Sequence, residues 1–170
     1  MKIKLSLFIL FLYLLTPCLS FAQSSKEALM ALKKLQAKIQ VGISYKEYGP
    51  ACGDAKFPVN LFLESHEAKQ NFKFTQSIKD AMKHYEGALE VWGCRFGLHG
   101  LTEVLSTPLY DPVIQNILKN NPELRSLVAQ NSGNLPITQA RDILLRLASQ
   151  DTDNASRLFS MNNKLIDSKK

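Results

Sequence analysis

The sequence predicts an all-α fold: an irregular helical bundle, made of a long kinked antiparallel helix hairpin closed by three or four shorter C-terminal helices. Apolar and small residues recur every three or four positions over residues 28–62 and again over 78–96, which is the spacing of one helix face. Stripes of this length need partner helices, because one helix cannot bury them alone. No run of alternating β-branched residues favours a strand.

The start of the chain has the features of a secretory signal peptide. Two lysines precede an apolar run over residues 5–15, which is shorter than the roughly 20 residues that a membrane-spanning helix needs. Two small residues, Ser20 and Ala22, suit cleavage after Ala22. We therefore expect a cleaved leader over residues 1–22 and a single helical domain over 23–170, periplasmic or secreted, without a transmembrane segment.

Cys18 leaves a second route open. The segment Leu15-Thr16-Pro17-Cys18 resembles a bacterial lipobox in part, in which the cysteine would be lipidated after cleavage. A proline directly before the cysteine departs from the small residue of that signal, so we prefer cleavage after Ala22, which removes Cys18 with the leader. Retention of the leader as a membrane anchor is the other alternative.

The first helix is expected to run from Lys26 to the neighbourhood of Tyr48. Gly49-Pro50 and Phe57-Pro58 then interrupt a stripe that continues to about residue 65. Each proline removes a backbone donor and clashes with the preceding turn. Because the stripe keeps its phase across both, we interpret the stretch as one long helix kinked at each proline, with full turns at the prolines as the alternative.

The second helix is the most amphipathic segment of the chain. Residues 66–74 are polar without a clear period, so we expect a loop there, followed by a helix from about residue 75 to Phe96. Gly87 and Gly93 are unusual inside a helix, since each costs roughly 1 kcal/mol relative to alanine. They favour the close approach of another helix.

Proline-containing turns divide the C-terminal part into shorter helices. Aspartate or asparagine followed by proline is typical of a helix start, and the NSGNLP segment is typical of a turn. The expected elements are a helical turn at 101–105, helices at 113–119, 123–130 and 137–148, a turn at 131–136, and a final helix capped by Asp151 and continuing to Leu165.

Two cysteines remain after the leader, Cys52 and Cys94, and an even number in an exported chain favours a disulfide. If the two long helices pair about a loop centre near residue 70, Cys52 lies opposite roughly residue 88 and Cys94 lies ~9 Å further along. A disulfide needs Cα atoms within about 7 Å of each other. A kink at Pro58 would close the gap, so a disulfide and two separate buried thiols both stay open.

The charge of the chain is too small and too dispersed to predict a nucleic-acid partner. The whole chain carries a formal charge of +6, and the leader contributes two lysines and no acids, which leaves +4. Nucleic-acid binding would require a basic stripe with interleaved aromatic residues, and the densest basic segments here are pairs of lysines.

The sequence contains no motif that predicts catalysis, a cofactor or a metal site. His66-Glu67 begins like the HExxH motif of zinc proteases, but residue 70 is Gln. His84 and His99 lack a second ligand at helical spacing, and there is neither a CxxCH haem motif nor a GxSxG nucleophile motif. We therefore expect a non-enzymatic protein without a cofactor, and an enzyme is the third alternative after the two binding roles described next.

Aromatic residues on the two long helices form the candidate ligand pocket. Their stripes are expected to face each other, and the first interpretation is an aromatic core. The second is a pocket for a small apolar ligand, with neighbouring glycines and prolines leaving room. We expect a binding or interaction module with an unknown protein partner, or else a carrier of a small apolar ligand or haem in this pocket. The residues are Tyr45, Tyr48, Tyr85, Trp92 and Phe96.

Overall fold

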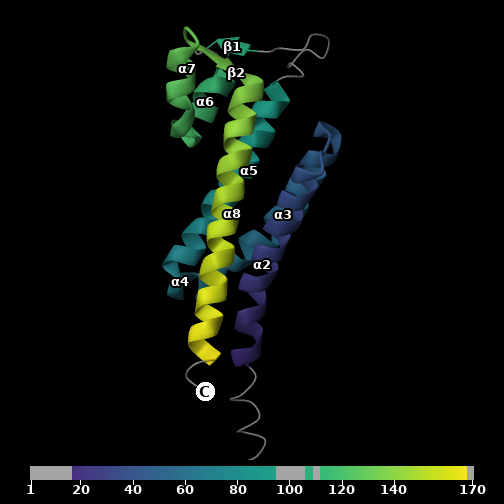
Figure 1. The fold of residues 1–170 in the computed structure, drawn as a ribbon, viewed down its shortest axis with the longest axis vertical. Coiled ribbons are helices and arrows are strands. Elements are labelled where there is room, and N and C mark those ends of the chain that lie inside the picture. Colours follow the sequence, from purple (N-terminus) through teal and green to yellow (C-terminus); the bar gives the residue numbers. More distant parts are fainter. Residues whose placement is uncertain (1–16, 95–105, 109–111, 168–170) are drawn as a thin grey trace, which may run out of the picture.

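The computed structural model describes residues 17–94, 106–108 and 112–167, with side chains described over 24–94 and 112–164 (Figure 1). The described residues form an all-α bundle, which confirms the predicted fold class. The elements are α2 (Pro17–Gln40), α3 (Tyr45–Glu64), α4 (His66–Gln70), α5 (Phe72–Cys94), β1 (Ser106–Pro108), α6 (Pro112–Asn120), η1 (Pro122–Leu124), α7 (Arg125–Gln130), β2 (Asn134–Pro136) and α8 (Ile137–Asp167).

Four long helices, α2, α3, α5 and α8, run side by side with sequential neighbours antiparallel (Figure 1). On α3 and α5, Tyr45 contacts Trp92 near one end, and Lys56 pairs with Glu86 further along. Helix α8 then returns along α5, so the rings of Phe74 and Phe159 meet at the opposite end. Because α8 also contacts α2, the four helices close around one core.

The break in the first predicted helix lies at residues 41–44 and not at the prolines. Helix α2 ends at Gln40, and Gly42 adopts a φ of 92°, a conformation that glycine reaches without a steric penalty. Glu47 then accepts hydrogen bonds from the backbone N–H and the hydroxyl of Ser44, which form a capping box at the start of α3. Both interior prolines continue within α3, so the expected kinked helix is in fact an α2–α3 hairpin.

The expected loop over residues 66–74 contains a short helix. The Ser65 hydroxyl accepts a hydrogen bond from the Ala68 N–H and so caps α4. Helix α5 begins at Phe72, three residues before the expected start near residue 75. A helix of one turn shows too little periodicity to be distinguished from a polar loop.

A small cap built from α6, η1, α7 and the β1–β2 pair lies at the end of the bundle where α5 ends and α8 begins (Figure 1). The helices near 113–119 and 123–130 are present as expected. The antiparallel pairing of Thr107 with Leu135 was not expected, because strands of three residues are too short to show alternation. The expected turn at 101–105 and Asp111 lie outside the described residues.

Helix α8 is continuous where two helices were expected. Asp151 does not cap a helix but lies within α8, where its carboxylate contacts His84 of α5. No proline or glycine occurs between residues 137 and 167, so nothing in the sequence interrupts the helix. The Thr152 hydroxyl donates to the Ala148 carbonyl and remains compatible with the helix.

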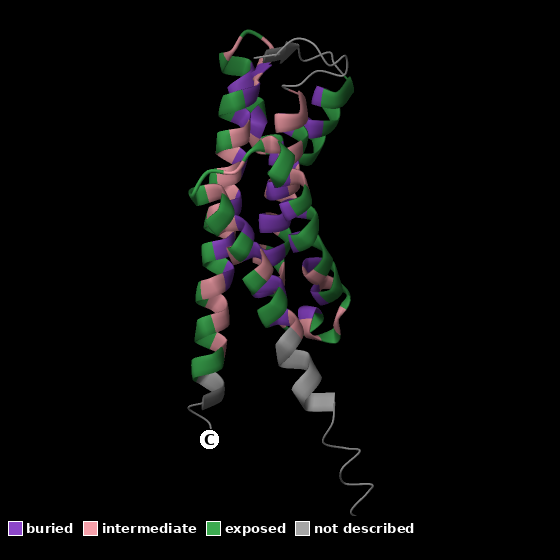
Figure 2. Ribbon diagram, turned by 90° about the vertical axis from the view of Figure 1, so that its right-hand side faces the viewer, coloured by how far each residue is buried: buried purple, intermediate pink, exposed green. Residues whose placement is uncertain are grey.

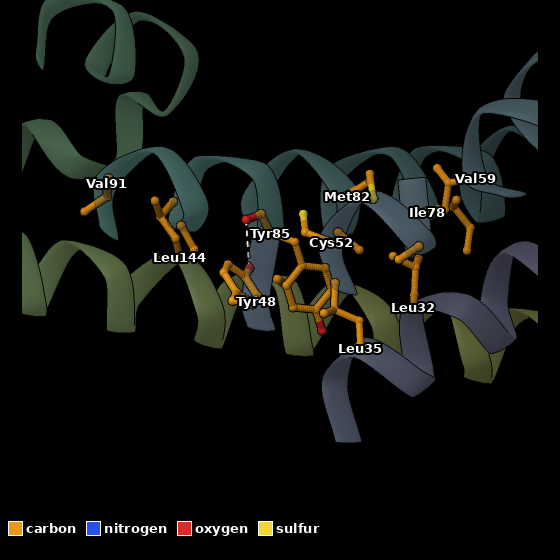
Figure 3. Packing of buried hydrophobic residues seen from close by; sticks show 14 of the residues in the cluster. Leu32, Leu35, Tyr48, Cys52, Val59, Ile78, Met82, Tyr85, Val91 and Leu144 are labelled. Carbon is orange, nitrogen blue, oxygen red and sulfur yellow. Dashed lines mark hydrogen bonds between the residues drawn. The ribbon is translucent and has the colours of Figure 1, made fainter. Parts of the chain in front are cut away.

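One apolar core extends along the bundle, and Figure 2 shows the buried residues on the inward faces of the long helices. The centre of this core, drawn in Figure 3, combines aliphatic residues of all four long helices with two tyrosines. The largest fully buried side chains are Tyr48, Tyr85, Phe62, Phe74, Leu32, Leu35, Ile78, Ile114, Ile117, Leu124, Leu135 and Ile137.

The predicted signal peptide stays a prediction. Helix α2 begins at Pro17, so cleavage after Ala22 would remove its first residues and leave the part that enters the core from Ser25 onward. Over the described ranges, we find no helix that combines the length and the apolar character needed to cross a membrane.

Candidate functional site

The predicted aromatic cluster is assembled from α3 and α5. The rings of Tyr45 and Tyr48 lie 5.8 and 5.6 Å from that of Trp92, measured between centroids. Tyr48 and Tyr85 are buried, whereas Tyr45 and Trp92 are half-buried. Phe96 lies outside the described residues. The structure therefore brings four of the five predicted residues to one part of the bundle.

The hydroxyls of Tyr48 and Tyr85 are engaged by the chain itself. The Tyr48 hydroxyl donates to the Tyr85 carbonyl at 2.8 Å, which Figure 3 shows as a dashed line, and the Tyr85 hydroxyl lies 3.4 Å from that of Thr152. Burial raises the pKa of Tyr85 to about 12. The Arg141 guanidinium lies 4.8 Å from the centre of the Trp92 ring. A ligand at this cluster stays a prediction.

Cys52 and Cys94 carry thiols and are not bonded to each other, which corrects the disulfide expectation. Gly49 lies beside Leu89, and Lys56 pairs with Glu86. Cys52 lies between these two points on α3, so it faces a part of α5 that precedes Cys94 in the helix. The gap of ~9 Å estimated from the sequence is therefore not closed by a kink at Pro58. Burial, followed by the nearby Glu86 carboxylate, raises the pKa of Cys52 to about 12.

His84 on α5 links three elements through two carboxylates. Its Nδ1 lies 2.9 Å from Asp151 Oδ2 on α8, and its Nε2 lies 3.0 Å from Glu123 Oε1 on η1. The Glu123 oxygen is buried, and its contact with His84 is close without being an aligned hydrogen bond. Burial raises the pKa of Asp151, and the hydrogen bond from His84 partly offsets this effect. No sequence pattern indicates this cluster, because its members lie far apart in the chain.

The cap contacts α5 at a second point, Gly87, which lies one helical turn from His84. The Asn121 side chain is 1% exposed and its Nδ2 donates to the Ile117 carbonyl. A Cβ at Gly87 would lie 2.7 Å from Asn121 Oδ1. The close approach predicted at this glycine is confirmed, although the approaching residue lies at the junction of α6 and η1 and not within another helix. Gly93 is likewise crowded by the Tyr45 hydroxyl.

An open hollow of about 780 Å³ lies between α6 and α7 on the cap. Leu118 and Val128 are nearly buried and form an apolar floor. Mainly exposed and polar residues surround this floor, so the hollow combines apolar area with groups that orient a ligand. Its other described lining residues are Gln115, Asn116, Lys119, Arg125, Ala129 and Gly133.

Two cations, Lys119 and Arg125, border this hollow. Lys119 and Arg125 are exposed and form no ion pair with any residue in the described part of the chain. The acid between them in sequence, Glu123, is turned towards His84 and away from the surface. The hollow therefore presents positive charge beside an apolar floor. The sequence does not indicate this pattern, because the chain alone does not show that Glu123 turns away from the two cations.

Within the described ranges, no group of three or more histidine, cysteine, aspartate or glutamate residues is arranged to hold a metal ion. Both ring nitrogens of His84 face carboxylates, so neither is open towards a substrate. The most developed surface feature is thus the basic and apolar hollow on the cap.

These features define a class of protein: a four-helix bundle with a small cap of short helices and one strand pair, which carries an open, positively charged hollow. Comparison of the chain with family models, with curated proteins and with solved structures gave no match.

Proposed function

We propose that this chain is an exported, non-enzymatic interaction module that binds a polypeptide partner in the hollow between α6 and α7. The observation that carries the proposal is an apolar floor bordered by two cations that form no ion pair with any described residue. Leu118 and Val128 would bury apolar side chains of the partner, and Lys119 and Arg125 would pair with its carboxylates.

The openness of the hollow favours a polypeptide over a small molecule. Small-ligand sites enclose most of the ligand surface, whereas this hollow lies on the outside of two short helices. A groove between exposed helices suits a segment whose apolar side chains point inward and whose acidic side chains reach the border.

The engagement of His84 supports a non-enzymatic role. A histidine that acts as a general base needs a ring nitrogen within hydrogen-bond reach of the substrate. Here one nitrogen contacts Asp151 and the other contacts Glu123, so the ring fastens the cap to the bundle. The alternative role as a carrier of a small apolar ligand or haem would require the packed rings of Tyr48 and Trp92 to move apart.

Site-specific photo-crosslinking in the native host tests the proposal. A photoreactive amino acid replaces Ala129, an exposed residue of the hollow, and in a matched control it replaces Gln150, an exposed residue of α8. We expect a discrete crosslinked protein from position 129 and none from position 150. Equal products from both positions, or none from either, would contradict the proposal.

A further inference from the structure

The outward face of α3 is exposed along its length although it carries large apolar side chains. Phe57 and Leu61 are 68% and 51% exposed. They lie one turn apart, and the remaining members of the face follow at steps of three or four residues, so they share one side of the helix. The face consists of Lys46, Pro50, Gly53, Phe57, Asn60, Leu61 and Glu64, and we call it the α3 face.

The α3 face carries opposite charges at its two ends, so two copies of it are complementary when they lie antiparallel. Lys46 begins it and Glu64 ends it, about 27 Å apart at 1.5 Å per residue. Neither residue forms an ion pair with any other described residue. When a second copy lies antiparallel, Lys46 of each copy comes opposite Glu64 of the other, and both ends of the contact are neutralised.

The same antiparallel alignment also places a large side chain opposite a small one at the centre of the α3 face. With Lys46 opposite Glu64, Gly53 of one helix lies opposite Phe57 of the other. A Cβ at Gly53 would meet nothing within 4 Å, so there is open space above this glycine for an aromatic ring. Two exposed phenylalanines would each be covered by the partner helix, which removes apolar area from water.

We propose that the α3 face is a homodimer interface in which two copies pack antiparallel about a two-fold axis. Such an axis makes every contact occur twice, as the two Lys46–Glu64 pairs and the two Phe57–Gly53 contacts require. A single helix pair buries less than a standard interface, so we expect a dissociation constant on the order of 10–100 µM. The hollow on the cap is not part of this contact.

Sedimentation equilibrium of the full chain from about 1 to about 500 µM measures the dimer. We expect Lys46→Glu and Glu64→Lys each to weaken it by about tenfold, because like charges then face each other twice. The double variant Lys46→Glu/Glu64→Lys restores both pairs and should return to within about threefold of the original value. Phe57→Glu should abolish the dimer.

Lys79→Glu is the matched control, since Lys79 is an exposed lysine on α5 outside the α3 face. It should leave the dissociation constant unchanged, and circular dichroism verifies that each variant folds. A chain that is monomeric up to the highest concentration overturns the proposal. A double variant that dimerises as weakly as the single variants also overturns it. So does a Phe57→Glu variant that keeps the dimer and loses only the binding of the chain to vesicles of anionic lipid.

Discussion

At the residue scale, a few close contacts determine where the elements can lie. Gly87 is the clearest case, because the cap approaches α5 where a side chain is missing. The Tyr48 hydroxyl shows the same dependence in the core, since it bonds the Tyr85 carbonyl across α3 and α5. These contacts explain why glycines and tyrosines occur at interior helix positions that other residues would occupy at lower cost.

Gly87→Ala should destabilise the protein although alanine favours helix. The added Cβ would collide with the Asn121 amide, so we expect a loss of about 1–3 kcal/mol in the free energy of unfolding. Gly53→Ala is the control, since a Cβ there meets nothing and should add about 0.5–1 kcal/mol. Urea unfolding of both variants at low protein concentration measures the difference, and equal effects would contradict the close contact.

Stability should fall as the pH rises from about 9 to about 12. Cys52 has a pKa of about 12 in the folded chain against an ordinary value of 9.0, and Tyr85 has about 12 against 10.0. In this window the unfolded chain loses protons that the folded chain keeps, so rising pH favours unfolding. Urea unfolding at a series of pH values measures the decline. Cys52→Ala should make it shallower, and an unchanged slope would contradict the burial of the thiol.

At the element scale, the structure shows which boundaries the sequence could indicate. The start of α3 was predictable, because Ser44 and Glu47 form a capping box directly after Gly42. In the sequence, the two prolines favour a break, yet α3 tolerates both of them. Asp151 predicts a helix start because aspartate is a common N-cap, whereas its carboxylate in fact contacts a histidine 67 residues away.

His84→Leu tests the link between the cap and the bundle. The substitution leaves the partly buried carboxylates of Glu123 and Asp151 without the polar partner that both of them contact, so we expect a loss of about 1–3 kcal/mol in the free energy of unfolding. Hydrogen exchange should accelerate most over residues 112–130. His66→Leu changes an exposed histidine of α4 and serves as the control. Equal hydrogen-exchange rates over residues 112–130 in the two variants would show that His84 does not fasten the cap.

At the whole-molecule scale, the sequence was sufficient for the fold class and for the register of α3 on α5. The estimate that Cys52 lies opposite roughly residue 88 agrees with the Lys56–Glu86 pair and with Gly49 beside Leu89. The hollow could not be predicted, because it depends on Glu123 turning from its sequence neighbours towards His84. Contacts between distant segments leave no periodic signal in the chain.

The most direct test of the proposed function is photo-crosslinking from position 129 with the charges of the hollow changed. Lys119→Glu/Arg125→Glu reverses both cations, whereas Lys119→Arg/Arg125→Lys keeps the charge and replaces the same residues. We predict that the crosslinked partner persists in the charge-conserving variant and disappears in the reversed one, because its carboxylates are repelled. An undiminished product in the reversed variant would contradict recognition through this hollow.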